Sequence, residues 1–148
     1  MNLSKLLLYF FIFFSYSYSQ VTFTENLIST NANGANQVFT IDVDGDGDID
    51  VVSASEYDDK IAWYENDGNQ VFTEQIISTN ADAAVSVHAL DMDGDGDIDL
   101  LSASFGDDKI AWYENDGDQV FTEQIISTNA DGANQVFTID VDGDGDID

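Results

Sequence analysis

Short runs of β-branched and aromatic residues, separated by small polar turn residues, fill the chain from about residue 20 onward. No 3.6-residue helical period persists there, so the pattern predicts strands. In the first unit the predicted strands are residues 37–43, 49–55, 60–65 and 70–78. Residues 66–69 read Asn-Asp-Gly-Asn, a strong hairpin signal because Asp-Gly accepts positive φ.

The pattern repeats at a step of 49 residues: Phe23-Thr24-Glu25 returns at Phe72 and again at Phe121. Four strands in a unit of this length are typical of a propeller blade. The predicted parts are a lone outer strand in residues 20–35, repeat 1 at 36–84, repeat 2 at 85–133 and a truncated repeat 3 at 134–148. A closed propeller typically needs four to eight blades. We therefore expect an all-β fold, a partial β-propeller of four-stranded antiparallel blades, and expect the sequence to be a fragment of a longer protein.

Some strands are apolar on both faces, as at Val51-Val52 and Ile76-Ile77. Blades that pack face to face bury both sides of each sheet, and an open β-solenoid of the same repeats is the alternative architecture. Trp63-Tyr64 and Trp112-Tyr113 recur in register. Because such rings bury large areas, we expect blade core; stacking on sugar rings is the alternative.

The formal net charge of −27 is the most unusual bulk property of the 148 residues. A chain this acidic resists compaction unless cations neutralise it, and it is a poor partner for nucleic acid or anionic membranes. Lys60 and Lys109 each follow an aspartate pair and are expected to form surface ion pairs of small energetic value. There is no cysteine, so disulfides cannot staple the fold.

Half of the acidic residues lie in a nine-residue motif, Asp-x-Asp-Gly-Asp-Gly-Asp-Ile-Asp, that occurs three times at the 49-residue step. Carboxylates at positions 1, 3, 5 and 9 suit a hard cation such as Ca²⁺, which takes six to eight oxygen ligands. Glycine at position 6 allows a sharp turn, and the main-chain carbonyl of position 7 adds an oxygen. The candidate metal residues are Asp42, Asp44, Asp46, Asp48, Asp50, Asp91, Asp93, Asp95, Asp97, Asp99, Asp140, Asp142, Asp144, Asp146 and Asp148.

The EF-hand shares the beginning of this motif but not the rest of it. An EF-hand needs a bidentate Glu at position 12 and flanking helices. Position 12 is Ser53 in the first copy and Ser102 in the second, and the flanks are strand-like. An EF-hand is therefore excluded.

The motif resembles the calcium loop of FG-GAP/VCBS repeats, as in the β-propeller heads of integrin α subunits. Their pattern, Asp-x-Asp-x-Asp-Gly-x-x-Asp between two strands of one blade, fits residues 42–50, 91–99 and 140–148 without a gap. The later Ala-Trp-Tyr-Glu-Asn-Asp-Gly of residues 62–68 resembles bacterial members. The resemblance covers nearly everything after residue 20 and implies calcium-stabilised propeller blades.

Residues 1–19 read as a secretory signal peptide. Lys5 supplies the positive charge, residues 6–14 are an apolar run, and Ser17 and Ser19 occupy the −3 and −1 positions before a predicted cleavage at Gln20. Nine apolar residues are too few to span a bilayer, so no membrane span is expected after signal removal. Localisation is expected to be secreted or at the cell surface.

These observations predict a secreted calcium-binding module that acts as an extracellular binding or adhesion scaffold, with a protein or glycan as partner. The alternatives are a non-catalytic propeller part of an extracellular polysaccharide-degrading enzyme, or a lectin-like propeller. No catalytic residue is predicted, because the paired aspartates belong to the cation loops. His88, the single histidine, stands where the other copies have Phe39 and Phe137 and is interpreted as repeat drift.

Overall fold

The computed structural model describes residues 20–148, which form two four-stranded antiparallel sheets and no helix. The first sheet, blade 1, has the order β1-β2-β3-β4, and the second, blade 2, the order β5-β6-β7-β8. The strands are β1 (Ala35–Ile41), β2 (Asp50–Ser55), β3 (Lys60–Asn66), β4 (Phe72–Ser78), β5 (Ala84–Leu90), β6 (Asp99–Ser104), β7 (Lys109–Asn115) and β8 (Phe121–Ser127). The predicted all-β fold, a partial propeller of four-stranded blades, is confirmed. The predicted signal peptide, residues 1–19, lies outside the described residues.

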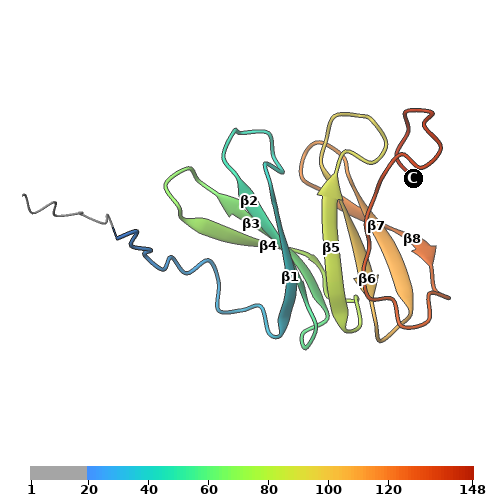
Figure 1. Ribbon diagram of the computed structural model, residues 1–148, viewed down its shortest axis with the longest axis horizontal. Helices are drawn as coiled ribbons and strands as arrows, with labels where there is room; N and C mark the ends of the chain where they lie inside the picture. The colour runs from blue at the N-terminus through green and yellow to red at the C-terminus, as the bar shows by residue number, and fades with distance from the viewer. Residues whose placement is uncertain (1–19) are drawn as a thin grey trace, which may run out of the picture.

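The two blades lie side by side, with β1 next to β5 (Figure 1). Cross-strand partners share a face of a sheet. Val52 therefore lies on the same face as its partner Trp63, and this face packs on blade 2. The opposing face of blade 2 supplies Val87, Leu100 and Tyr113 to the same core cluster. Both sheets are thus buried on the face that meets the other.

Three of the four recurring aromatic residues are buried: Trp63 and Tyr64 are each 3% exposed and Tyr113 is 1% exposed, as predicted for blade core. Trp63 and Tyr113 belong to the cluster between the blades, whereas Tyr64 lies on the other face of blade 1 with its partner Val51. Trp112 is only half-buried, because it lies on the face of blade 2 that points away from blade 1. The ring of His88 lies between those of Phe39 and Phe137, at centroid distances of 4.7 Å and 5.4 Å. The three side chains that occupy this repeat position therefore contact one another in a row.

Two predicted segments form no strand in the structure. Residues 20–34 contain no strand, although the matching sequence forms β4 and β8 in the blades. β4 pairs with β3 and β8 pairs with β7, and no such partner precedes residue 35 among the described residues. The truncated repeat behaves in the same way: residues 133–139 match β1 in sequence but form no strand among the described residues.

The expectation that Lys60 and Lys109 form ion pairs on the surface is wrong in one respect, because both residues are 6% exposed. Lys60 contacts Asp58 at 3.3 Å and Glu74 at 2.7 Å, and its ammonium also donates to the carbonyl of Asn31 at 2.7 Å. Lys109 repeats this with Asn80. Each lysine therefore fixes the segment that enters its blade. Burial alone would lower the pKa of Lys60, but the bonds to Glu74 and Asp58 outweigh it and raise the pKa.

Candidate metal centre

The three aspartate motifs lie in loops at the same end of the molecule (Figure 1). The first joins β1 to β2 and the second joins β5 to β6, whereas the third follows residues 133–139, which form no strand. Gly45 and Gly47 have φ of 76° and 97°, the left-handed region that favours glycine. The second and third loops repeat these angles closely. The predicted sharp turn at position 6 is therefore present in each loop.

Carboxylates within each loop hold the backbone in this shape. The two oxygens of Asp42 accept hydrogen bonds from the amides of Gly45 and Gly47, both at 2.9 Å. Asp44 accepts from the amide of Asp46 at 3.2 Å, and Asp46 from that of Asp48 at 2.8 Å. Such aspartate-to-backbone bonds form local turns without help from a sheet. Every one of these bonds has a counterpart in the second and third loops.

The aspartate at position 9 connects its loop to the blade. Asp50 is fully buried and accepts hydrogen bonds from the amide of Val43 at 3.0 Å and the amide of Asn66 at 2.8 Å. Asp99 is 1% exposed and accepts from Met92 at 3.1 Å and from Asn115 at 2.8 Å. Each carboxylate thus ties the start of its loop to the end of β3 or β7. In the third loop Asp148 is exposed and accepts from the amide of Val141 at 3.0 Å.

In all three loops the carboxylates at positions 1 and 3 lie close together, and a third aspartate carboxylate completes each group. Oxygens of each set lie within 4.8 Å of one another. The sets are Asp42, Asp44 and Asp50; Asp91, Asp93 and Asp95; and Asp140, Asp142 and Asp148. Position 9 completes the first and third sets and position 5 completes the second. Asp46, Asp99 and Asp144, also predicted as ligands, are not part of these close groups, although they lie in the same loops.

The side chain at position 7 points away from these groups. A Cβ placed on Gly117, where φ is 82°, would approach Oδ2 of Asp97 to 2.6 Å. Asp48 lies against Gly68 in the same manner. The hairpin position therefore requires glycine for two reasons: its φ is positive, and a Cβ would clash with the carboxylate. The use of the main-chain carbonyl of position 7 as an ion ligand stays a prediction.

The donor set fits a hard divalent cation. Three carboxylates packed this closely repel one another, and no lysine of residues 20–148 contacts them, because Lys60 and Lys109 bond elsewhere. Burial raises the pKa of Asp99. Burial also raises the pKa of Asp44, to which the charges of Asp46, Asp50 and Asp42 add. The close carboxylates therefore have no neighbouring positive side chain in residues 20–148, and an all-oxygen set of this kind is what Ca²⁺ prefers.

A family model described as FG-GAP-like repeat matches residues 42–102 and 91–148. The chain belongs to the FG-GAP-like repeat family. No curated protein and no solved structure gives a significant match. Each family match begins at the first aspartate of a loop, so an FG-GAP-like unit in this chain is an aspartate loop followed by strands of the blade.

Asn66 and Asn115 are site residues that the sequence reasoning missed. Besides the amide bond to the buried aspartate, the side chain of Asn66 donates to the carbonyl of Ile49 at 3.0 Å, and that of Asn115 donates to Ile98 at 3.2 Å. Each asparagine therefore bonds to two consecutive residues: the one that precedes β2 or β6, and the aspartate that begins that strand. Its recurrence at the 49-residue step was a usable signal, but the Asn-Asp-Gly context pointed only to a hairpin turn.

These shifts predict how the stability of the ion-free fold and the gain from calcium depend on pH. A carboxyl group whose pKa is raised by folding binds more protons when folded, so protonation stabilises the ion-free fold. We expect the melting temperature in chelator to rise as pH falls from about 5 toward about 4, the range in which carboxyl groups near their ordinary pKa take up protons. We expect the gain caused by calcium to shrink over the same range, because protons compete for the same oxygens. Thermal melting across this range, with and without Ca²⁺, measures both.

The control for this prediction is His88→Phe, which places in β5 the residue that the other copies carry. Burial lowers the pKa of His88, so this group loses stability as pH falls and opposes the carboxylates. In the variant background the loss of stability that His88 causes below about pH 6.5 should be absent, so that only the carboxyl-driven rise toward about pH 4 remains. An ion-free melting temperature that falls over this interval in the variant would contradict the assignment.

Proposed function

We propose that this chain is a secreted, calcium-stabilised module of FG-GAP-like repeats that serves as an extracellular binding scaffold. The observation that carries the proposal is the threefold grouping of carboxylate oxygens within 4.8 Å, each group in a loop already shaped by its own side chains. Ca²⁺ held by these aspartates would neutralise the carboxylates of each loop and so stabilise the fold.

The same chemistry supports an extracellular location. Extracellular modules bind calcium with Kd of roughly 10⁻⁴ to 10⁻³ M, which suffices in calcium-rich media. The basic and apolar beginning of the sequence supports export. Within residues 20–148 no helix is long and apolar enough to cross a membrane. We propose a non-catalytic role, because the recurring aspartates serve the loops.

Asp44→Ala tests the structural role of a single ion. Asp44 belongs to the first carboxylate group but makes only an exposed bond to the amide of Asp46. In chelator we expect the variant and the wild type to have the same melting temperature. In calcium we expect the variant to lose about a third of the calcium-induced gain in melting temperature, since two sites remain. A variant that gains as much from calcium as the wild type does would contradict this role of Asp44.

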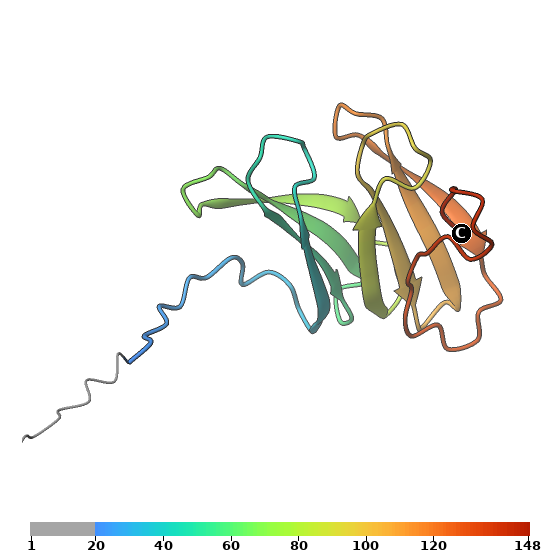
Figure 2. The same cartoon turned by 45° about the horizontal axis from the view of Figure 1, so that its top comes forward.

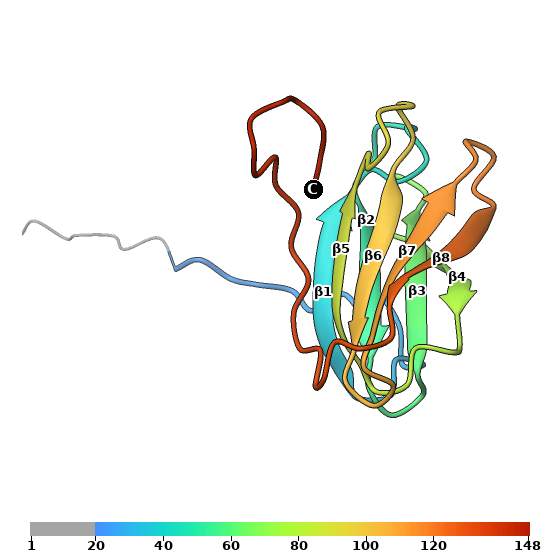
Figure 3. The same cartoon turned by 90° about the vertical axis from the view of Figure 1, so that its right-hand side faces the viewer.

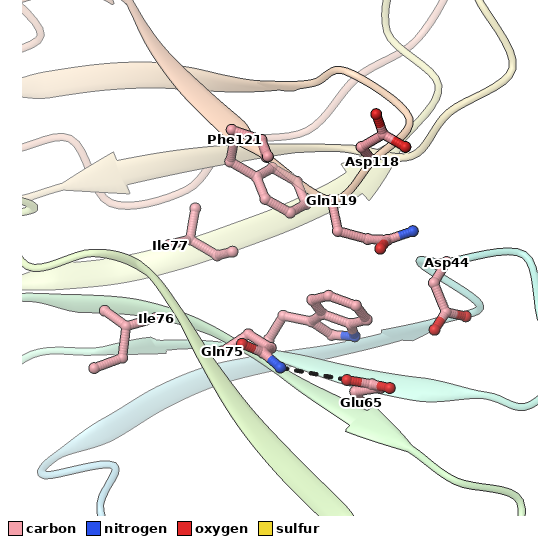
Figure 4. A pocket seen from close by; sticks show the side chains of 10 residues that line it. Asp44, Glu65, Gln75, Ile76, Ile77, Asp118, Gln119 and Phe121 are labelled. Atoms are coloured by element: carbon pink, nitrogen blue, oxygen red, sulfur yellow. Dashed lines mark hydrogen bonds between the residues drawn. The ribbon is translucent and has the colours of Figure 1, made fainter.

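A pocket between the blades favours a lectin-like module as a second candidate. Its volume is about 470 Å³, and its walls come from β3 and β4 of blade 1 and from the β7–β8 turn of blade 2 (Figure 4). Glu65 and Gln75, which bond to each other at 3.3 Å, face Asp118 and Gln119 across it. Such amides and carboxylates are suited to the hydroxyl groups of a sugar.

Trp63 lines the pocket together with Phe121, but it is 3% exposed, so its ring offers no stacking platform to a sugar. Its indole N–H is also buried and has no hydrogen-bond partner among the described residues. Trp63 therefore serves as a reporter of binding in this pocket. Titration of tryptophan fluorescence with monosaccharides and disaccharides, followed by a glycan array, tests this candidate. The absence of a saturable response would leave a protein partner as the proposal.

A further inference from the structure

Two segments of the repeat, residues 58–82 and 107–131, are identical in sequence except at one position. Blade 1 has Asn69 there, in the β3–β4 hairpin, whereas blade 2 has Asp118, in the β7–β8 hairpin. Only the second of these hairpins lines the pocket between the blades. The one difference between the segments therefore adds a carboxylate to the side of the pocket that blade 2 forms.

Three carboxylates line this pocket, and no cation of the described chain faces them. Asp118 is exposed, and Asp44 and Glu65 are half-buried on blade 1. Asp44 also belongs to the first carboxylate group, so bound Ca²⁺ would neutralise it, but Glu65 and Asp118 belong to no such group. Lys60 and Lys109 are 6% exposed and bond elsewhere, and the sequence has no arginine. The charge that complements this pocket must therefore come from a ligand.

The other end of the pocket is apolar. Ile76, Ile77 and Phe121 lie there, away from the carboxylates (Figure 4). Ile76 is 60% exposed and Val120 is 58% exposed, although the two blades are already packed together. Lysine and arginine side chains combine an apolar stem with a charged end, and so match a pocket that is apolar at one end and acidic at the other. The apolar end offers no hydrogen bond to the hydroxyl groups of a sugar.

We propose that this pocket receives lysine or arginine side chains from a basic segment of a partner protein. The inference rests on the proposed role of the chain as a binding scaffold, and it names the chemistry of the partner. The apolar stem lies on Ile76 and Phe121, and the charged end reaches Glu65 and Asp118. The aspartate loops and both hairpins lie at this same end of the blades (Figure 2) (Figure 3), so a basic segment that leaves the pocket meets further negative charge.

Exchange of the two residues that distinguish the segments tests the pocket without a change in net charge. The double variant Asp118→Asn with Asn69→Asp moves one carboxylate from the pocket to the hairpin that does not line it. Calorimetric titration in calcium at physiological salt, with a blocked peptide of alternating lysine and alanine, measures the dissociation constant. We expect saturable binding to the wild type and a dissociation constant about three to five times higher in the double variant, because one ion pair is lost.

The same titration contains the results that would overturn the proposal. Equal affinities of the wild type and the double variant would show general attraction of the peptide to a chain with a formal charge of −27. A wild type that does not bind the lysine peptide would contradict the proposal directly. A peptide with norleucine in place of lysine keeps an apolar stem without the charge, and we expect no saturable binding of it.

Ile76→Ser tests the apolar end of the pocket. The matched control is Ile125→Ser, because Ile125 is the counterpart in β8, is 59% exposed and does not line the pocket. We expect the dissociation constant of the lysine peptide to rise about threefold in Ile76→Ser, from the lost apolar contact, and to stay unchanged in Ile125→Ser. Equal effects of the two substitutions would overturn the placement of the stem.

Two outcomes distinguish this inference from the proposed function. A saturable response to sugars, together with none to the lysine peptide, would overturn the inference in favour of the lectin-like candidate. Peptide binding that the double variant leaves unchanged, in a chain that still takes up calcium, would overturn the pocket and leave the calcium-stabilised scaffold in place. Absence of calcium binding would instead contradict the proposed function.

Discussion

Removal of calcium is expected to lower the free energy of unfolding by about 1.4 to 2.7 kcal/mol for each occupied site, if calcium was present at ten to a hundred times its Kd. The effect is large because a carboxylate group within 4.8 Å repels itself once the cation leaves. Two or three sites together amount to about 3 to 8 kcal/mol, a large part of the stability of a domain of this size. The melting temperature should then fall by at least about 10 °C.

Thermal melting monitored by circular dichroism checks this expectation, with excess Ca²⁺ in one sample and chelator in the other. Magnesium at equal concentration is the control for ionic strength and charge, because Mg²⁺ prefers octahedral geometry and keeps its water ligands. Restoration of the original melting temperature by added Ca²⁺ would show that the change is reversible. A melting temperature that is the same in calcium, magnesium and chelator would contradict a structural role for the ions.

Asp50→Ala is expected to destabilise the calcium-loaded protein by about 3 to 5 kcal/mol. The carboxylate is fully buried and accepts the amides of Val43 and Asn66. Its removal leaves two amides without an acceptor, each costing about 1 to 3 kcal/mol when buried, and weakens the first ion site. Asp50→Asn, which keeps the size and one acceptor oxygen, should lie between the wild type and the alanine variant.

The chain offers a matched control at the same motif position. Asp148 is exposed and accepts one amide, that of Val141. Asp148→Ala should therefore cost about 1 kcal/mol or less apart from its share of the third ion site. Urea unfolding of both variants in calcium and in chelator separates the amide bonds from the ion. Equal losses for Asp50→Ala and Asp148→Ala in chelator would contradict the anchoring role assigned to Asp50.

The blades could be predicted from the sequence because local signals and the repeat agree. The Asp-Gly at residues 67–68 fixes the hairpin that follows β3, and the predicted strand bounds differ from the observed ones by no more than two residues. The aspartate spacing likewise predicted which carboxylates lie in each loop. These features are encoded within one unit and need no knowledge of its neighbours.

What the sequence did not reveal depends on contacts between units. Residues 20–34 have the composition of a strand, but a strand also needs a pairing partner, and none of the described residues supplies one. Lys60 reads as a surface residue from its charge, yet the packing of the preceding segment buries it. Asp50 and Asp148 are identical in motif, but Asp50 begins β2, is fully buried and also accepts the amide of Asn66.

The most direct measurement is the number of calcium ions bound per chain, determined by equilibrium dialysis or calorimetric titration at neutral pH. The three carboxylate groups predict saturable binding of three ions, with Kd of roughly 10⁻³ M or tighter. Loss of one ion in Asp44→Ala would assign a site to the first loop. Absence of saturable binding up to about 10 mM calcium would contradict the account that the aspartate loops are metal sites.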